Sequence, residues 1–150
     1  MKYAVIGAGG MGIQYGVLLQ EFAHKDVDFV DTWKPNVEKI REQGGAYVSQ
    51  DGEDRHLVPI NVYYPEEYAG QPDVWIVFLK QMQLDGVLKR CAHLFNEKQI
   101  VFSAMNGYGH FEKLNEYFST DRIYGGTALI GATCTAPAIS TSPAEYMPRP

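Results

Sequence analysis

At 150 residues, with 45% hydrophobic and 21% charged residues, the chain has the length and composition of one globular domain with its own core. A net charge of −5 with scattered basic residues disfavours a nucleic-acid surface, and no apolar run reaches the roughly 20 residues that a membrane helix needs. The first residues pass from a short apolar stretch straight into glycines, unlike a signal peptide, so we expect a cytoplasmic protein.

Strands and helices are predicted to alternate from the beginning of the chain. Residues 2–6 are a short apolar run followed by glycines, which is typical of a buried parallel strand. Residues 11–22 carry apolar side chains at helical spacing, and residues 26–31 alternate in the manner of a strand. A turn and then a helix are expected over residues 32–43, where Pro35 suits the first helical turn.

A hairpin is predicted after that helix, which Gly44 and Gly45 bring to an end. Residues 46–49 and 56–63 are rich in strand-forming residues, and the pair Asp51-Gly52 between them is a turn signal. The pattern therefore predicts two antiparallel strands here, in contrast to the alternation on either side.

The second half returns to strands that alternate with helices. Strands are predicted over residues 73–79, 99–104 and 122–129, and helices over residues 84–95 and 111–118. Residues 133–150 hold four prolines and are expected to be an irregular or edge-strand segment. The alternation predicts an α/β fold of the Rossmann type, a doubly wound, mostly parallel sheet with helices on both faces. We expect residues 1–150 to be one dinucleotide-binding domain and a fragment of a longer protein.

A glycine-rich motif, Gly7-Ala8-Gly9-Gly10-Met11-Gly12, lies where the first predicted strand turns into the first predicted helix. The pattern G-x-G-x-x-G is weak by itself, and this context strengthens it. Gly7 permits a tight turn, Gly9 lets a pyrophosphate approach the backbone, and Gly12 lets helix and strand pack closely. Free N–H groups at the start of the helix favour phosphates. The motif predicts that residues 7–12 bind a nicotinamide dinucleotide, with a structural glycine turn as the alternative.

Asp31 is the candidate ligand for the adenosine ribose. It follows Gly12 by 19 residues and ends the second predicted strand, where the acidic residue that binds the ribose 2′-hydroxyl is expected. A carboxylate there repels a 2′-phosphate, so Asp31 favours NAD(H). Lys34 and Arg41 would offset this preference if either reached the ribose, and a solvated turn aspartate is the other interpretation.

The cysteines and histidines predict no metal site. Cys91 and Cys134 lie far apart and lack metal-ligand spacing, so both are expected to be reduced core thiols. The four histidines follow neither HxxxH nor HExxH.

Three further motifs follow predicted strands, namely Val77-Phe78-Leu79-Lys80-Gln81-Met82-Gln83, Asn106-Gly107-Tyr108-Gly109 and Gly125-Gly126-Thr127. Together with the glycine loop, they resemble the N-terminal domain of the ketopantoate reductase (2-dehydropantoate 2-reductase) family over nearly the whole chain. The strand-ending lysine followed by Asn-Gly-x-Gly is the more specific part of this resemblance. The family implies a second, all-helical domain, absent from this chain, with the active site between the two domains.

The resemblance also implies roles for single residues. Lys80 matches a lysine that contacts the cofactor and lies near the substrate, and Asn106 matches an asparagine at the nicotinamide ribose and the substrate. Ala132 matches a backbone contact with the cofactor. The family's catalytic lysine and its carboxylate partner belong to the helical domain, so no catalytic residue is expected in this chain. From the residues alone, Lys80 also fits a solvated cation and Asn106 a turn residue.

The resemblance implies that the full-length protein reduces a 2-oxo acid to a 2-hydroxy acid by hydride transfer from NAD(P)H, as from ketopantoate to pantoate in pantothenate biosynthesis. NADP(H) follows from the family, whereas Asp31 favours NAD(H). The alternatives are an NAD-dependent D-2-hydroxyacid dehydrogenase of the same family and a non-catalytic dinucleotide-sensing module. The expected partner is a small-molecule 2-oxo acid, and the sequence leaves undecided whether the protein forms a homodimer. The fragment alone is expected to bind dinucleotide weakly and to reduce nothing.

Overall fold

Six parallel strands form the large sheet of the computed structural model, which describes residues 1–51, 53–128 and 131–143. The strands are β1 (Tyr3–Ile6), β2 (Val27–Val30), β5 (Asn61–Tyr63), β6 (Val74–Val77), β7 (Ile100–Ser103) and β8 (Ile123–Gly125). They lie in the order β5-β2-β1-β6-β7-β8, and each neighbouring pair is parallel. This is the strand order of doubly wound, dinucleotide-binding sheets, so the predicted Rossmann-type α/β fold is confirmed.

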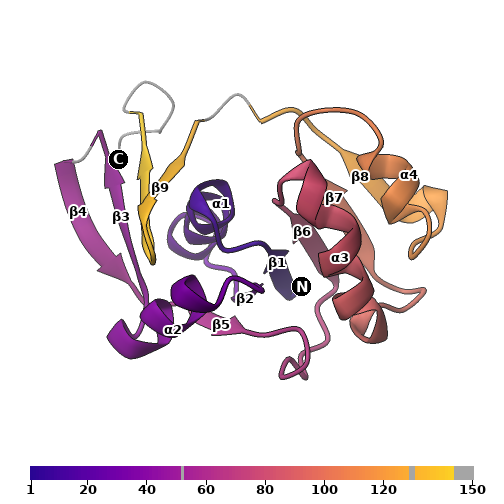
Figure 1. Ribbon diagram of the computed structural model, residues 1–150, viewed down its shortest axis with the longest axis horizontal. Coiled ribbons are helices and arrows are strands. Elements are labelled where there is room, and N and C mark those ends of the chain that lie inside the picture. Colours follow the sequence, from indigo (N-terminus) through magenta and orange to yellow (C-terminus); the bar gives the residue numbers. More distant parts are fainter. Residues whose placement is uncertain (52, 129–130, 144–150) are drawn as a thin grey trace.

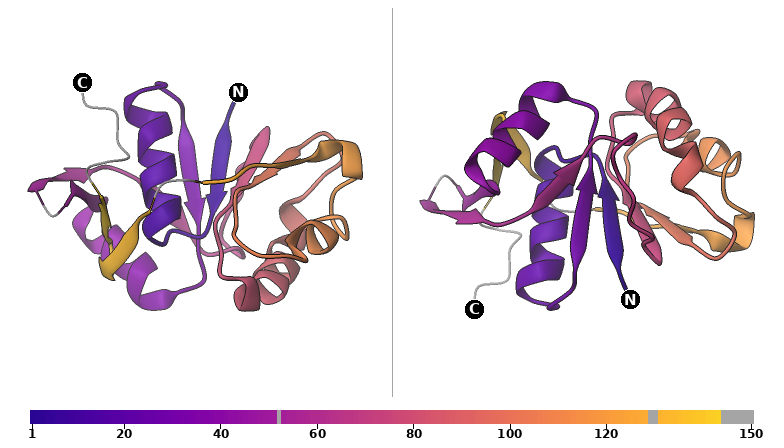
Figure 2. Two further views of the ribbon diagram at one scale, coloured as in Figure 1. Left: turned by 90° about the horizontal axis from the view of Figure 1, so that it is seen from above. Right: turned by 90° about the horizontal axis from the view of Figure 1, so that it is seen from below.

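Helices pack on both faces of the large sheet. They are α1 (Gly10–Glu21), α2 (Lys34–Gln43), α3 (Gln81–Cys91) and α4 (His110–Leu114), with short 3₁₀ turns at η1 (Ala92–Leu94) and η2 (Thr120–Arg122). Successive side chains of a strand point to opposite faces. Val5 accordingly belongs to a core shared with α1 and α2, and Ile6 to a core shared with α3 and α4. Figure 2 shows helices on both sides of the large sheet. Among the described helices, none is long and apolar enough to cross a bilayer.

A second, smaller sheet holds the predicted hairpin and part of the tail. Its strands are β3 (Ala46–Gln50), β4 (Glu53–Val58), β9 (Thr133–Ala136) and β10 (Ile139–Ser142), in the order β4-β3-β10-β9. β3 and β4 are antiparallel as predicted, although Gly52 of the expected turn lies outside the described residues. The prediction of an irregular or edge segment after residue 133 is wrong for β10, an inner strand that pairs in parallel with β3. Residues 144–150 of that segment lie outside the described residues.

Other boundaries differ from the prediction as well, and α3, predicted over residues 84–95, is Gln81–Cys91. Residues 56–63 do not form one strand, because the chain leaves the small sheet at Pro59, which has no N–H to donate, and enters the large sheet as β5. The helix expected over residues 111–118 begins at His110 and ends at Leu114. The strand expected over residues 122–129 ends at Gly125, and residue 129 lies outside the described part of the chain.

Helix α1 lies between the two sheets (Figure 1). Its buried glycines make this possible, because they let other backbone and side chains approach the helix closely. A Cβ on Gly16 would overlap the ring of Phe29 in the large sheet, and a Cβ on Gly10 would lie 2.8 Å from the backbone nitrogen of Cys134 in β9. Helix α1 therefore packs closely against both sheets, at Gly16 against the large one and at Gly10 against the small one.

Candidate functional site

A cavity of about 640 Å³ lies along the carboxyl edge of the large sheet. Its wall includes residues that follow four adjacent strands: Met11 after β1, Asp31 after β2, Lys80 after β6 and Asn106 after β7. In an open α/β sheet this edge is where ligands bind. Most predicted site residues line this one cavity, namely Gly7, Gly9, Gly10, Met11, Asp31, Lys80, Asn106 and Ala132, whereas Ala8 and Gly12 do not.

The glycine loop shows which of its members leave room for a ligand. Gly7 has φ +100°, and a Cβ there would overlap the carbonyl oxygen of Phe78. A Cβ on Gly12 would overlap the carbonyl oxygen of Gly7, so these two glycines are required by packing. At Gly9, by contrast, an added Cβ would meet nothing within 4 Å. The space beside Gly9 is therefore open to the cavity.

The first turn of α1 adds hydrogen-bond donors to this space. The first N–H groups of a helix have no acceptor inside it, and Gly9, at the N-cap, has no side chain to accept from them. Nor does this turn carry an acidic residue that would compete for the positive end of the helix. The arrangement suits an anion held by backbone N–H groups.

Asp31 is buried, and the backbone around the glycine loop uses both of its carboxylate oxygens. Oδ2 accepts from the N–H of Ala8 at 2.8 Å. Oδ1 accepts from the N–H groups of Thr32 at 2.6 Å and Trp33 at 2.9 Å. The spacing from Gly12 predicted an acidic residue at the end of β2, and the structure adds that its carboxylate fastens this strand end to the glycine loop.

Asn36 is a fully buried residue of α2 that the sequence analysis missed. Its Nδ2 donates to the carbonyl oxygen of Ala8 at 2.8 Å, with a longer contact of 3.4 Å to Asp31. Its Oδ1 accepts from the N–H of Ala138, between β9 and β10, at 2.8 Å. One side chain thus joins the glycine loop to the small sheet. Its place five residues after Asp31, in the first turns of a helix, is the only sequence signal for this role.

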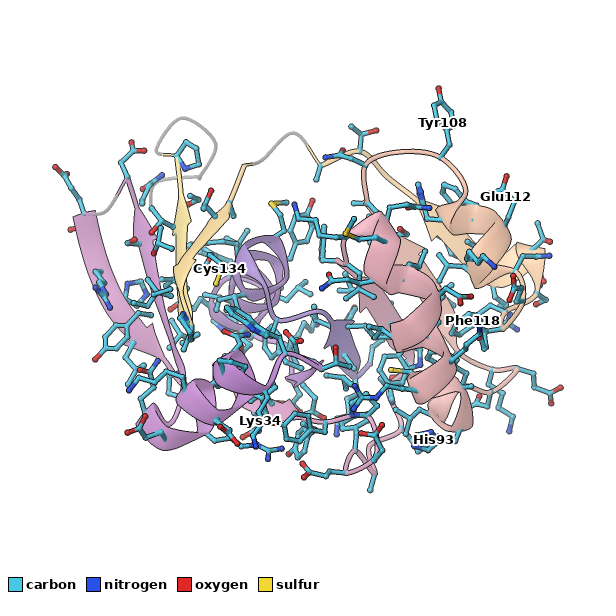
Figure 3. The ribbon with its side chains drawn as sticks, viewed as in Figure 1. Lys34, His93, Tyr108, Glu112, Phe118 and Cys134 are labelled. Atoms are coloured by element: carbon cyan, nitrogen blue, oxygen red, sulfur yellow. The ribbon has the colours of Figure 1, made fainter. Side chains whose placement is uncertain are left out.

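The β9–β10 hairpin packs on the head of α1. The hydroxyl of Ser140 donates to the carbonyl oxygen of Gly10 at 2.9 Å, and a Cβ on Gly10 would lie 2.9 Å from the carbonyl oxygen of Ala132. Cys134 faces the cavity from β9 (Figure 3). The expectation of a core thiol is confirmed for buried Cys91 but wrong for Cys134, which is only partly buried because the cavity opens beside it. Burial still raises the pKa of the Cys134 thiol.

Lys80 and Asn106 lie at the other end of the cavity and are exposed. Lys80 precedes α3, and within the described residues neither side chain has a hydrogen-bond or ion-pair partner. The nearby loop is tied to α3, because Nε2 of Gln81 donates to the carbonyl oxygen of Tyr108 at 2.9 Å. The side chain of Tyr108 itself points away from the molecule (Figure 3).

The two cations considered for the adenosine end have partners elsewhere. Lys34 lies 3.5 Å from Glu38, and Arg41 donates to Glu67 and to the carbonyl oxygen of Val62. Lys80 is the one lysine or arginine among the described residues that line the cavity.

Comparisons with known proteins identify the family of the chain. Residues 3–142 match the family described as ketopantoate reductase PanE/ApbA. The chain is 30% identical over 139 residues to the 2-dehydropantoate 2-reductase of Lactococcus lactis subsp. lactis (strain IL1403), covering 91% of this chain and 44% of that protein.

Two solved structures have a similar fold. A 2-dehydropantoate 2-reductase from Geobacter metallireducens GS-15 superimposes with a TM-score of 0.80 at 28% identity, covering 95% of this chain and 46% of that one. A D-mandelate dehydrogenase with NADH and anilino(oxo)acetate superimposes with a TM-score of 0.87 at 27% identity, covering 95% and 45%. The chain therefore spans less than half the length of each of these relatives.

Proposed function

The chain belongs to the ketopantoate reductase family, and we propose that it is the dinucleotide-binding part of an NAD(P)H-dependent reductase of 2-oxo acids. One observation carries this proposal. The open space at Gly9, beside the uncapped first turn of α1, lies in the same cavity as Lys80 and Asn106. A ligand with an anionic middle and two extended ends therefore has a site along the sheet edge.

The donors and shapes in the cavity fit a dinucleotide. Backbone N–H groups at Gly10 and Met11 would bind the diphosphate, because an added Cβ on Gly9 would meet nothing within 4 Å and phosphates can therefore approach the backbone there. Asp31 at the end of β2 would face the adenosine ribose, and Lys80 and Asn106 after β6 and β7 would face the nicotinamide end.

The charges at the adenosine end support NAD(H) over NADP(H). Asp31 brings a carboxylate to this end, whereas Lys34 and Arg41 form ion pairs with Glu38 and Glu67. A 2′-phosphate here would meet a negative charge without a compensating cation. We expect the chain to bind NADH at least about tenfold more tightly than NADPH, a difference of about 1.4 kcal/mol.

At the other end, Lys80 and Asn106 would hold the substrate rather than donate its proton. The ammonium group of Lys80 has no anionic partner among the described residues and would pair with the carboxylate of a 2-oxo acid. The side-chain amide of Asn106 would orient the nicotinamide ribose and the substrate. The bound reduced nicotinamide supplies the hydride to the ketone carbon. The proton for the resulting alkoxide would come from a lysine outside these 150 residues.

Two titrations and one rate assay test the proposal. NADH and NADPH are titrated into the 150-residue chain by calorimetry, and the full-length gene product is assayed with ketopantoate and both cofactors. We expect weak binding by the chain, a preference for NADH, and turnover only by the longer protein. Absence of any dinucleotide binding by either protein would refute the proposal. Tight binding without turnover by the longer protein would favour a dinucleotide sensor.

An NAD-dependent D-2-hydroxyacid dehydrogenase is the second candidate. The likeness to D-mandelate dehydrogenase with NADH favours it, as does the carboxylate of Asp31. Comparing kcat/KM for ketopantoate and for an aromatic 2-oxo acid such as phenylglyoxylate, each with NADH, separates the two candidates. A higher value for the aromatic acid would identify the dehydrogenase.

A further inference from the structure

Trp33 is a half-exposed aromatic residue on the wall of the cavity, two positions after Asp31. The residue is 46% exposed, whereas the other tryptophan, Trp75, is fully buried and packs edge-on against Tyr68 and Phe95. An exposed aromatic face on a cavity wall has a free surface that a planar ligand can cover.

The backbone of Trp33 is fixed by hydrogen bonds, and the residue is about half exposed. Its N–H donates to Oδ1 of Asp31 at 2.9 Å, and its carbonyl oxygen accepts from the N–H of Asn36 at 3.0 Å and of Val37 at 3.1 Å. The residue thus forms the N-cap of α2 and also belongs to the network that holds the glycine loop. The backbone therefore fixes where the side chain of Trp33 begins, and the exposure of the residue leaves part of the indole open to a ligand.

The order of the strands puts Trp33 on the side of the cavity that the proposed function assigns to the adenosine end. Along the sheet edge, Trp33 follows β2, the glycine loop follows β1, Lys80 follows β6 and Asn106 follows β7, and these strands are adjacent in that order. A diphosphate at the head of α1 divides the ligand at β1. One end then reaches β2 and the other reaches β6 and β7.

We propose that the adenine base stacks on the indole of Trp33 and that this residue fixes the position of the adenosine end of the dinucleotide. This inference rests on the proposed function. Adenine is planar and uncharged, so it suits an aromatic face beside a carboxylate that is already hydrogen-bonded. Stacking of a base on an aromatic side chain is a strong enough contact to be measured by substitution.

Trp33→Ala tests the stacking, because alanine keeps the backbone hydrogen bonds of position 33. Titrations use the 150-residue chain with NADH, with ADP, and with reduced nicotinamide mononucleotide, which lacks the adenosine half. The expected result is a loss of affinity for NADH and ADP of roughly 5- to 100-fold, with affinity for the mononucleotide unchanged. Trp33→Phe should retain most of the binding. Phe22→Ala, at another exposed aromatic residue outside the cavity, should leave all three affinities unchanged.

Nuclear magnetic resonance supplies a readout that a purely structural role would not move. In the wild type, the adenine H2 and H8 signals of bound NADH should shift upfield under the indole ring, and Trp33→Ala should abolish the shift. Emission from buried Trp75 should stay the same and show that the variant is folded. Equal NADH binding by wild type and Trp33→Ala would overturn the inference and leave the proposed function standing. So would an equal loss of mononucleotide binding. A wild type that binds no dinucleotide would overturn both.

Discussion

The two ends of the cavity are built differently. At the end near β2, Asp31 and Asn36 are buried and joined by hydrogen bonds to the glycine loop and to the β9–β10 hairpin. At the end near β6 and β7, the side chains of Lys80 and Asn106 are exposed and have no partner among the described residues. The first end is organised before any ligand arrives, and the second is not.

This difference shows which part of the site the chain can complete by itself. Preorganised groups bind a ligand without the cost of ordering side chains, whereas exposed lysine and asparagine side chains must be ordered when the ligand binds. Substitutions at the first end should therefore change stability and binding together. Substitutions at the second end should change binding or turnover alone.

Substitutions in the glycine loop should have the largest effects. Whether they lower stability or NADH affinity should depend on the position. Gly12→Ala places a Cβ on the carbonyl oxygen of Gly7, which belongs to the backbone and cannot move away, so we expect a loss of about 3 kcal/mol or more in unfolding free energy. Gly9→Ala meets no atom within 4 Å, so its stability should stay within about 0.5 kcal/mol of wild type. Its affinity for NADH should nevertheless fall at least about tenfold, because the methyl group enters the phosphate space.

Gly86→Ala in α3 is the matched control for both glycine variants. A Cβ there also meets nothing, so alanine should stabilise the helix by about 0.5–1 kcal/mol without changing NADH binding. Urea unfolding and calorimetric titration measure the two quantities. Wild-type affinity in Gly9→Ala would show that no ligand approaches this loop.

Asp31→Asn should have the next largest effect. The amide group replaces one carboxylate oxygen by a donor, which faces the N–H of Ala8 or those of Thr32 and Trp33. Loss of hydrogen bonds to a buried charged group should lower the unfolding free energy by about 2 kcal/mol and weaken NADH binding as well. Urea unfolding checks the first effect. In Asp121→Asn, at an exposed aspartate, the unfolding free energy should stay within about 0.5 kcal/mol of wild type. Equal losses in the two variants would show that the buried carboxylate of Asp31 contributes no more to stability than an exposed one.

Lys80→Ala tests the end of the cavity near β6 and β7, where we expect turnover to change without stability. The side chain is exposed and unpaired within the described residues, so we expect unfolding free energy to change by less than about 0.5 kcal/mol. In the full-length protein, kcat/KM for the 2-oxo acid should fall at least about tenfold, because the substrate carboxylate loses its cation. Lys98→Ala, at another exposed lysine, should leave both quantities unchanged. Wild-type kinetics in Lys80→Ala would remove Lys80 from the site.

The large sheet could be predicted from sequence, and the small sheet only in part. Apolar runs, helical spacing and the glycine motif are local signals, and they place Gly9 and Asp31 at the ends of their strands. The strand β10 is Ile-Ser-Thr-Ser, a short and mostly polar segment, and its partner β3 lies about 90 residues earlier. No local sequence pattern predicts the pairing of β10 with β3. The hydrogen bonds of Asn36 join residues 8, 36 and 138, which only the folded chain brings together.

The same limit applies to the roles of site residues. The spacing from Gly12 located Asp31, but it could not reveal that three backbone N–H groups occupy the carboxylate. Trp33 carries no signal of its own, because a single aromatic residue near a turn is common on protein surfaces. Sequence thus predicts where a strand ends and what chemistry stands there, whereas the partners of each group depend on the tertiary structure.

The smallest effect is expected from an ion pair that lies outside the cavity lining. It serves as a control for the substitutions at the two ends of the cavity. Arg90 of α3 donates to Glu66 through Nε at 2.7 Å and through Nη2 at 2.9 Å, and this guanidinium lowers the pKa of Glu66 to about 2. Because the folded-state pKa lies below the ordinary value of 4.5, the pair stabilises the fold fully above about pH 5 and less as the pH falls towards about 2. Both side chains are about half exposed, so the contribution should stay below about 1 kcal/mol.

Glu66→Gln should therefore lower the urea midpoint slightly at neutral pH, and the difference from wild type should shrink on acidification. Its NADH affinity should equal that of wild type, because neither Glu66 nor Arg90 lines the cavity. A change in NADH affinity would mean that binding depends on the whole sheet edge rather than on two separately built ends.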